Sequence, residues 1–298
     1  DGAMALVFEQ MPRRDVFERT GIQFMQINGL YRLAAYLRDN SSLIDAAHSL
    51  LTITDLFNYW LSGSKSCEFT QLTTTQLYNP HTGDWAREVL SAIGMPERVL
   101  TPIVQPGTQI GSYEGLDVIV PCCHDTGSAV VGVPTTTENY AYLSSGTWSL
   151  LGLESPHAII NDATYAANLT NEGGYDGTFR LLKNIMGLWL VQQCRQTWRD
   201  AGHDYSYGDL VQLAEAEAPF RFMIDPDTTN FLKPGDHPAH VQAYCRAKGQ
   251  ATPQTHGEII RTVYESLALK YRVVLDKLLE VSGQRVDTLH IIGGGSQN

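Results

Sequence analysis

Two apolar runs that each end in small polar residues constrain the fold of this chain most. The run in VIVPCCHDTGSAVVG, residues 118–132, ends in His124 and Asp125. The run in YLSSGTWSLLG, residues 142–152, ends in a Ser-Ser-Gly-Thr turn. Short apolar runs with turn residues at their ends are typical of buried strands. The sequence therefore predicts two strands that present polar groups at their ends.

Residues 1–100 are expected to be mainly helical. Gly21 and Gly63 follow apolar residues at helical spacing and are expected to end helices. Thr54 or Asp55 is the expected N-cap of the helix that Gly63 ends. The Thr-rich stretch TQLTTTQL is expected to be extended or a loop, because β-branched residues favour strands.

Beyond residue 140 the pattern mixes strands and helices. We expect a helix over 185–197 and a longer one over 259–282, which Gly283 ends. Asn184 and Gln192 are eight residues apart, about two helical turns, so the first helix would place them on one face. TLHII is expected to be a short buried strand before three glycines. The polar stretch 134–141 is the expected domain boundary.

The composition excludes several classes of function. Of the 298 residues, 43% are hydrophobic and 18% are charged, so the chain can bury a sizeable core. The formal net charge of −11 argues against nucleic acids and anionic membranes as partners, since both bind basic surfaces. No apolar run is long enough to span a membrane. Five scattered cysteines predict reduced thiols and a cytoplasmic protein.

The carboxylate after the first strand has two interpretations. Asp125 or Thr126 could be the N-cap of a helix that starts at this point. Alternatively, Asp125 could be a general base, held where the hydroxyl group of a substrate must lose a proton. His124 could contact the same substrate, although a histidine beside a strand is more often a structural group.

The glycine-containing turns are also ambiguous. SSGT could be an ordinary hairpin turn or a cradle for phosphate oxygens. The three glycines after TLHII could form a flexible turn or a flat surface for a nucleoside. Neither the P-loop pattern nor the dinucleotide-binding pattern occurs. His237, His240 and Cys245 have the spacing of zinc ligands but lack a nearby fourth ligand, so we expect no metal site there.

Three motifs in order, HDTGSAVVGVP, YLSSGTWSLLG and LHIIGGGSQN, resemble the FGGY family of sugar kinases, which belongs to the actin-like ATPase group. The resemblance implies an α/β, actin-like (ribonuclease H-like) two-domain fold with a cleft between the domains. Residues 1–134 would be the later part of the sugar-binding domain, and residues 135–298 the first part of the ATP-binding domain. An early phosphate-binding motif of the family is missing, so we expect a chain truncated at both ends and inactive by itself.

The resemblance also implies roles for individual residues. Asp125 would be the catalytic base, and His124 and Asp125 would contact the sugar. The substrates would be ATP, with Mg²⁺, and L-rhamnulose, which would be phosphorylated on its C1 hydroxyl group. Alternatives are a kinase of the fuculokinase or xylulokinase type, or a non-catalytic actin-like nucleotide-binding protein. The residues expected to bind ATP are Thr147, Asn184, Gln192, Gly293 and Gly294.

Overall fold

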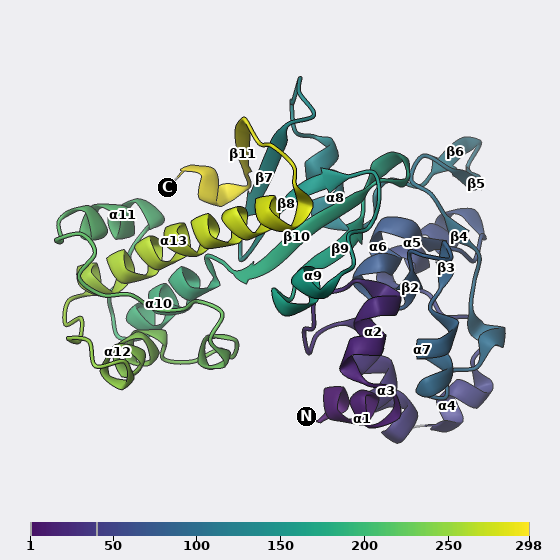
Figure 1. The fold of residues 1–298 in the computed structure, drawn as a ribbon, viewed down its shortest axis with the longest axis horizontal. Helices are drawn as coiled ribbons and strands as arrows, with labels where there is room; N and C mark the ends of the chain where they lie inside the picture. Colours follow the sequence, from purple (N-terminus) through teal and green to yellow (C-terminus); the bar gives the residue numbers. More distant parts are fainter. Residues whose placement is uncertain (1, 40, 298) are drawn as a thin grey trace. The chain divides into compact units, whose positions relative to one another are not determined.

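The computed structural model describes residues 2–39 and 41–297, and this part of the chain divides into two compact units (Figure 1). Unit 1 contains Asp1–Tyr140 and Gly152–Lys183, and unit 2 contains Ala141–Leu151 and Asn184–Asn298. The chain therefore passes from one unit to the other three times. The predicted boundary between residues 134 and 135 stays a prediction.

The first part of unit 1 is helical, as the sequence predicts. Gly21 and Gly63 both adopt the left-handed conformation as C-caps. The N-cap of the helix that Gly63 ends is Thr52, not the predicted Thr54 or Asp55, and Asp55 completes a capping box with it. The helices of unit 1 are α1 (Ala3–Gln10), α2 (Arg13–Thr20), α3 (Gly29–Asp39), α4 (Ser41–Ala46), α5 (Ile53–Ser62), α6 (Phe69–Thr74), α7 (Arg87–Ala92), α8 (Asp125–Val131) and α9 (Asp162–Ala166).

Short strands connect these helices. β1 (Cys67–Glu68) pairs in parallel with β4 (Ile103–Val104), whereas three further pairs of unit 1 are antiparallel. The antiparallel pairs are β2 (Tyr78–Asn79) with β3 (Asp84–Trp85), β5 (Gln109–Tyr113) with β6 (Leu116–Ile119), and β9 (Thr170–Gly173) with the start of β10 (Phe179–Met186).

The core of unit 1 is rich in aromatic residues. Phe69 packs edge-to-face against Tyr78 and Phe179, with ring centroids 5.2 and 5.6 Å apart. Gly173 lies against the same ring, since a Cβ atom there would come within 2.6 Å of it. Phe69 is the first residue of α6 and Gly173 the last of β9, so this contact fixes the helix on the strand.

Unit 2 combines segments of several strands with a helical subdomain. β11 (Thr288–Ile292), β7 (Tyr140–Ser145) and β8 (Trp148–Ser155) are neighbours in that order, and β8 and β10 continue into unit 1. The long helix α13 packs against the other three helices of the unit and is capped by Thr255 and Gly283 (Figure 1). The helices are α10 (Trp189–Asp200), α11 (Tyr207–Glu215), α12 (His237–Ala247) and α13 (His256–Ser282).

Four local predictions are wrong. TQLTTTQL is largely helical, because the buried Glu68 side chain caps α6 and offsets the low helix propensity of threonine. The helix predicted over 185–197 begins at Trp189, since β10 continues to Met186. The strand before Cys122 ends at Ile119. β11 is half-exposed to exposed along its length, because it lies at the edge of its sheet.

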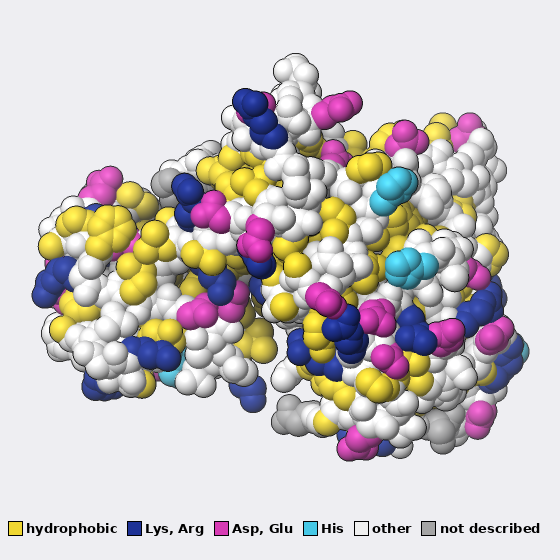
Figure 2. All heavy atoms as spheres, in the orientation of Figure 1, with side chains coloured by type: hydrophobic (Ala, Val, Ile, Leu, Met, Phe, Trp, Pro, Cys, Tyr) yellow, Lys and Arg dark blue, Asp and Glu magenta, His cyan; other side chains and the backbone are white. Residues whose placement is uncertain are grey.

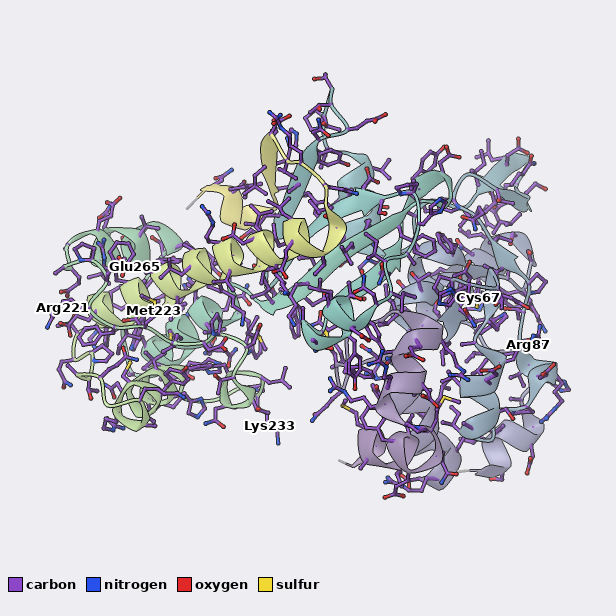
Figure 3. The ribbon with its side chains drawn as sticks, viewed as in Figure 1. Cys67, Arg87, Arg221, Met223, Lys233 and Glu265 are labelled. Atoms are coloured by element: carbon purple, nitrogen blue, oxygen red, sulfur yellow. The ribbon has the colours of Figure 1, made fainter. Side chains whose placement is uncertain are left out.

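The five cysteines are free thiols, and four of them are buried. Cys67, labelled in Figure 3, lies 3.3 Å from the hydroxyl oxygen of Thr101. Burial raises the pKa of its thiol to about 12, so the thiol stays protonated and unreactive at neutral pH. On the face shown in Figure 2, acidic and basic side chains are interspersed and do not form one basic area.

Candidate functional site

Asp125 is the first residue of α8, and its side chain is 95% exposed. His124 occupies the N-cap position but makes no capping hydrogen bond through its side chain. The Asp125 carboxylate accepts a hydrogen bond from the backbone N–H of Thr126 at 2.6 Å. Neither Asp125 nor Thr126 is therefore the N-cap of this helix. The carboxylate lies at a helix start in contact with solvent, where it can meet a ligand.

The backbone leading to Asp125 is held by two buried residues that sequence reasoning missed. Glu68 accepts hydrogen bonds from the N–H groups of Thr70, Gln71 and Cys123, at 2.8, 2.9 and 3.1 Å. The hydroxyl oxygen of Thr70 accepts from the N–H of His124 at 3.2 Å. Burial raises the pKa of Glu68. No motif could have identified this pair, because the two segments are far apart in the chain.

His124 lies beside a buried ion pair. Arg180 Nη2 lies 3.2 Å from His124 Nδ1 and 3.3 Å from Glu172 Oε2. On the other side of the ring, His124 Nε2 lies 3.6 Å from Asp125 Oδ1. Burial lowers the pKa of His124, and Arg180 lowers it further, while Glu172 and Asp125 act in the opposite direction. The imidazole is therefore neutral at pH 7.

In unit 2 the SSGT turn meets the start of α10. The hydroxyl group of Thr147 and the side-chain amide of Gln192 are hydrogen-bonded at 3.1–3.3 Å. The backbone N–H groups of Leu188 and Trp189 donate to the carbonyl oxygens of Gly146 and Thr147 at 2.9 and 3.0 Å. Thr147 itself is exposed. Two of the predicted ATP-binding residues, Thr147 and Gln192, are thus brought together.

The glycine-rich turn after β11 lies against the same segment. Gly293 has a φ of +87°, and a Cβ atom on it would come within 2.6 Å of the carbonyl oxygen of Ser145. A Cβ atom on Gly295 would come within 2.1 Å of the hydroxyl oxygen of Ser145. Gly294 has no atom within 4 Å of its would-be Cβ. Gly295 was not among the predicted site residues, although it lies closer to Ser145 than Gly294 does.

A tyrosine of α13 contacts the serines beside this turn. The Tyr271 hydroxyl group lies 2.7 Å from the hydroxyl oxygen of Ser149 and is also hydrogen-bonded to Ser145. Burial raises the pKa of Tyr271. Ser145 therefore contacts both the glycine-rich turn and the longest helix of unit 2. Sequence reasoning missed Tyr271, because it reads as one more apolar position of that helix.

Asn184 lies on β10 and is half-buried. Asn184 and Gln192 do not share a helical face, contrary to the prediction, because only Gln192 belongs to a helix. His237, the first of the three residues with zinc-ligand spacing, is buried with its ring nitrogens 3.2 and 3.1 Å from the carbonyl oxygens of Gly235 and Phe231. These contacts give His237 a structural role at the start of α12.

Within residues 2–39 and 41–297, no three His, Cys, Asp or Glu side chains are grouped so that they could hold a metal ion. None of the helices in these ranges is both long and apolar enough to cross a membrane.

Comparisons with known proteins identify relatives along the whole chain. The chain is 42% identical over 307 residues to a rhamnulokinase of Bacteroides thetaiotaomicron. It is 43% identical over 303 residues to a rhamnulokinase of Pectobacterium carotovorum. Both matches cover 100% of this chain, but 62% and 60% of the relatives. The chain thus spans about three fifths of the length of these curated relatives.

Solved structures show the same fold at low identity. A ligand-bound xylulose kinase from Lactobacillus acidophilus has a TM-score of 0.75 at 16% identity, covering 99% of this chain and 62% of that one. A glycerol kinase with ADP from Plasmodium falciparum has a TM-score of 0.72 at 15% identity, covering 100% of this chain and 62% of that one. These matches confirm the predicted actin-like kinase fold.

Family models account for nearly all of the sequence. Residues 2–132 match the N-terminal domain of the FGGY family of carbohydrate kinases. Residues 141–298 match the C-terminal domain of the same family. The segment carrying Asp125 falls in the first match, and the segment carrying Thr147, Gln192 and the glycine-rich turn falls in the second. The chain therefore belongs to the FGGY family of carbohydrate kinases.

Proposed function

We propose that the protein transfers the γ-phosphate of ATP to the C1 hydroxyl group of L-rhamnulose. Family membership supports a carbohydrate kinase, and relatives at 42–43% identity named rhamnulokinase support the choice of sugar. The single observation that carries the chemistry is the exposed carboxylate of Asp125 at the start of α8, with a histidine beside it. The product pair is L-rhamnulose 1-phosphate and ADP.

Asp125 is the proposed general base. The C1 oxygen forms a bond to the γ-phosphorus, its proton passes to the Asp125 carboxylate, and the bond from phosphorus to the β,γ-bridging oxygen breaks as ADP leaves. His124 and Asp125 are the proposed contacts to the sugar. A general base contributes about 10²–10⁴-fold to a rate. Positioning and charge stabilisation supply the rest in phosphoryl transfer.

The proposed ATP site is in unit 2. Thr147 would meet phosphate oxygens, and Gln192, hydrogen-bonded to it, would line the nucleotide site. The exposed Gly293 and Gly294 would lie against the adenosine. Asn184 is the remaining proposed contact. Mg²⁺ bound together with ATP would offset the charge of the phosphates. Because Mg²⁺ usually keeps several water ligands in proteins, such a site would not require a cluster of three protein side chains. With five free thiols, the protein is proposed to work in the cytoplasm.

Replacing Asp125 with asparagine tests the proposal. Asparagine has nearly the same shape but cannot accept the proton, so we expect turnover to fall about 10²–10⁴-fold while sugar and ATP still bind. ADP release with L-rhamnulose is measured in a form of the protein with the length of its curated relatives. Calorimetry on the same variant measures binding of both substrates.

The matched control is Asp117→Asn, the same change at an exposed aspartate on the β5–β6 hairpin of unit 1. It should leave turnover within a factor of two of the unchanged protein. Near-normal turnover of Asp125→Asn would reject Asp125 as the base. Faster ADP release with L-fuculose or D-xylulose would reject L-rhamnulose as the preferred sugar. Sugar-independent ATP hydrolysis coupled to polymer formation would favour an actin-like nucleotide-binding or assembly protein instead of a sugar kinase.

A further inference from the structure

Arg180 is a buried cation that the proposed reaction does not use. Its Nε donates to the carbonyl oxygen of Gly173 at 3.0 Å, and its Nη2 donates to Glu172 Oε2 at 3.3 Å. The antiparallel register of β9 and β10 places Arg180 directly opposite Glu172. Arg180 is 0% exposed and Glu172 is 4% exposed. Burying such a pair is costly, and it often adds nothing to stability compared with apolar residues.

The ion pair reaches the candidate site through one atom. Arg180 Nη2 lies 3.2 Å from His124 Nδ1. A guanidinium group can only donate hydrogen bonds, so Nδ1 must be the acceptor and carries no proton. The imidazole proton is then on Nε2, the nitrogen that lies 3.6 Å from Asp125 Oδ1. That separation is longer than a hydrogen bond, so Nε2–H can donate to a ligand oxygen instead.

We propose that Arg180 is a positioning residue that holds His124 as the neutral Nε2–H tautomer, so that His124 donates a hydrogen bond to an oxygen of the sugar beside Asp125. This inference rests on the proposed function for the identity of the ligand. The inference adds a hydrogen-bond donor, the Nε2–H group of His124, in a fixed orientation next to the proposed base Asp125. A donor of this kind recognises a hydroxyl or carbonyl oxygen and rejects a deoxy position.

The charges around His124 explain why a cation is needed there. Glu172 on β9 and Asp125 on α8 both favour the imidazolium form of His124. An imidazolium ion beside Asp125 would offset the charge of the carboxylate and weaken it as a base. Arg180 on β10 and burial both oppose protonation. The backbone N–H of His124 donates to the hydroxyl oxygen of Thr70 on α6. This hydrogen bond fixes the backbone of His124, so the imidazole ring stays between Arg180 and Asp125.

Nitrogen NMR on the 298-residue chain measures the tautomer of His124 directly. In the unchanged chain at about pH 7–8 we expect one form of His124, with Nδ1 unprotonated and Nε2 protonated. In Arg180→Met we expect both tautomers and a higher pKa, because Glu172 and Asp125 then act unopposed. Arg180→Met combined with Glu172→Gln removes both buried charges, so this pair of changes remains informative if the single variant does not fold.

Two results from this experiment would overturn the proposal. One is a proton on Nδ1 of His124 in the unchanged chain. The other is an unaltered, single Nε2–H tautomer in the Arg180→Met, Glu172→Gln variant. The matched control is Arg261→Met with Glu265→Gln, a poorly exposed ion pair of α13 in unit 2. That control should leave the His124 signals unchanged.

Kinetics separate positioning from a purely structural role. In the form with the length of the relatives, Arg180→Met with Glu172→Gln should raise KM for the sugar about tenfold, as for one lost hydrogen bond, with KM for ATP unchanged. His124→Gln can place an amide N–H near the position of Nε2–H and should retain most sugar affinity. His124→Asn can reach only the Nδ1 position and should not. Equal KM values for these two histidine variants would contradict the proposed donor.

The two proposals fail in different ways. If the unchanged protein phosphorylates no sugar, the proposed function is wrong, while the NMR result still decides whether Arg180 sets the tautomer. If the protein is active but the tautomer does not depend on Arg180, the positioning role is wrong and the function stands.

Discussion

Gly293 and Gly294 are adjacent in the chain, but only one of them depends on being glycine. Gly293 has a positive φ, and a side chain there would collide with the backbone oxygen of Ser145. Gly293→Ala must therefore shift the turn, which costs about 1–3 kcal/mol for a strained backbone position. Gly294→Ala meets no atom within 4 Å and serves as the matched control. Urea unfolding of both variants measures the difference.

The same pair of variants tests the proposed nucleotide site. Displacing the turn should weaken ATP–Mg²⁺ binding in Gly293→Ala, as measured by calorimetry on the form with the length of the relatives. If Gly294 lies against the adenosine, Gly294→Ala should weaken ATP binding without a loss of stability. Unchanged ATP affinity in both variants would remove the glycine-rich turn from the proposed site.

The residues that sequence reasoning identified and those it missed differ in a physical way. Asp125, His124 and Thr147 belong to compact motifs, so the sequence carries their signal within a few positions. Glu68 accepts from the backbone N–H of Cys123, and Arg180 contacts the ring of His124, each from a segment more than fifty residues away. Their role depends on packing and strand register, which a single sequence does not reveal.

At the scale of elements, α13 depends on the cap at its start. Thr255 and Glu258 form a reciprocal capping box. Thr255→Ala removes the hydroxyl acceptor of the Glu258 N–H and should lower the free energy of unfolding by about 0.5–2 kcal/mol. Thr255→Ser keeps a hydroxyl group and should lose much less. Equal losses in the two variants, measured by urea unfolding, would show that the cap contributes little.

α12 should respond to pH through His237 at its first position. Burial is the main cause that lowers the pKa of this imidazole. The unfolded chain, with an ordinary histidine pKa of about 6.5, then binds more protons than the folded protein. Stability is therefore fully present above about pH 6.5 and falls as the pH drops below that value.

Substitution of His237 with glutamine tests this pH dependence. Glutamine can still donate to one of the two carbonyl oxygens but does not titrate. The unfolding free energy should therefore change less steeply with pH between about pH 7 and pH 5 in this variant. Near pH 8, the difference in unfolding free energy between the variant and the unchanged protein should not depend on pH. An unchanged slope in urea unfolding experiments would exclude His237 as a contributor.

Elements with complete local signals were predicted well. The helix over 259–282 and the strands around SSGT appear as expected. The prediction for TQLTTTQL failed because the side chain of Glu68, two residues before the stretch, caps a helix there, whereas the propensity of threonine favours a strand. The start of α10 was misplaced because an apolar strand running into an amphipathic helix shows no change of composition.

At the scale of the whole molecule, each unit has its own apolar core. Leu72 belongs to the core of unit 1 and Leu210 to that of unit 2, and each is almost fully buried. Replacing either with alanine should cost about 2–5 kcal/mol. Hydrogen exchange should then accelerate mainly in the unit that carries the change. Leu116→Ala, at a leucine that is 73% exposed, is the matched surface control.

Equal acceleration of hydrogen exchange in both units after either core change would show that the two units unfold as one cooperative body.

The fold class itself could be predicted from the sequence, because three ordered motifs identify the family. The residues assigned to each unit could not, since segments distant in the chain assemble into one core only through packing.

Because the chain crosses between the two units three times, neither unit can be produced by simply shortening the gene. Neither unit corresponds to one uninterrupted stretch of codons, because 152–183 returns to unit 1 after 141–151 has entered unit 2. A single protease cut, or a single stop codon, therefore cannot release either unit whole. Isolating unit 2 would require splicing 141–151 to 184–298 through a new linker.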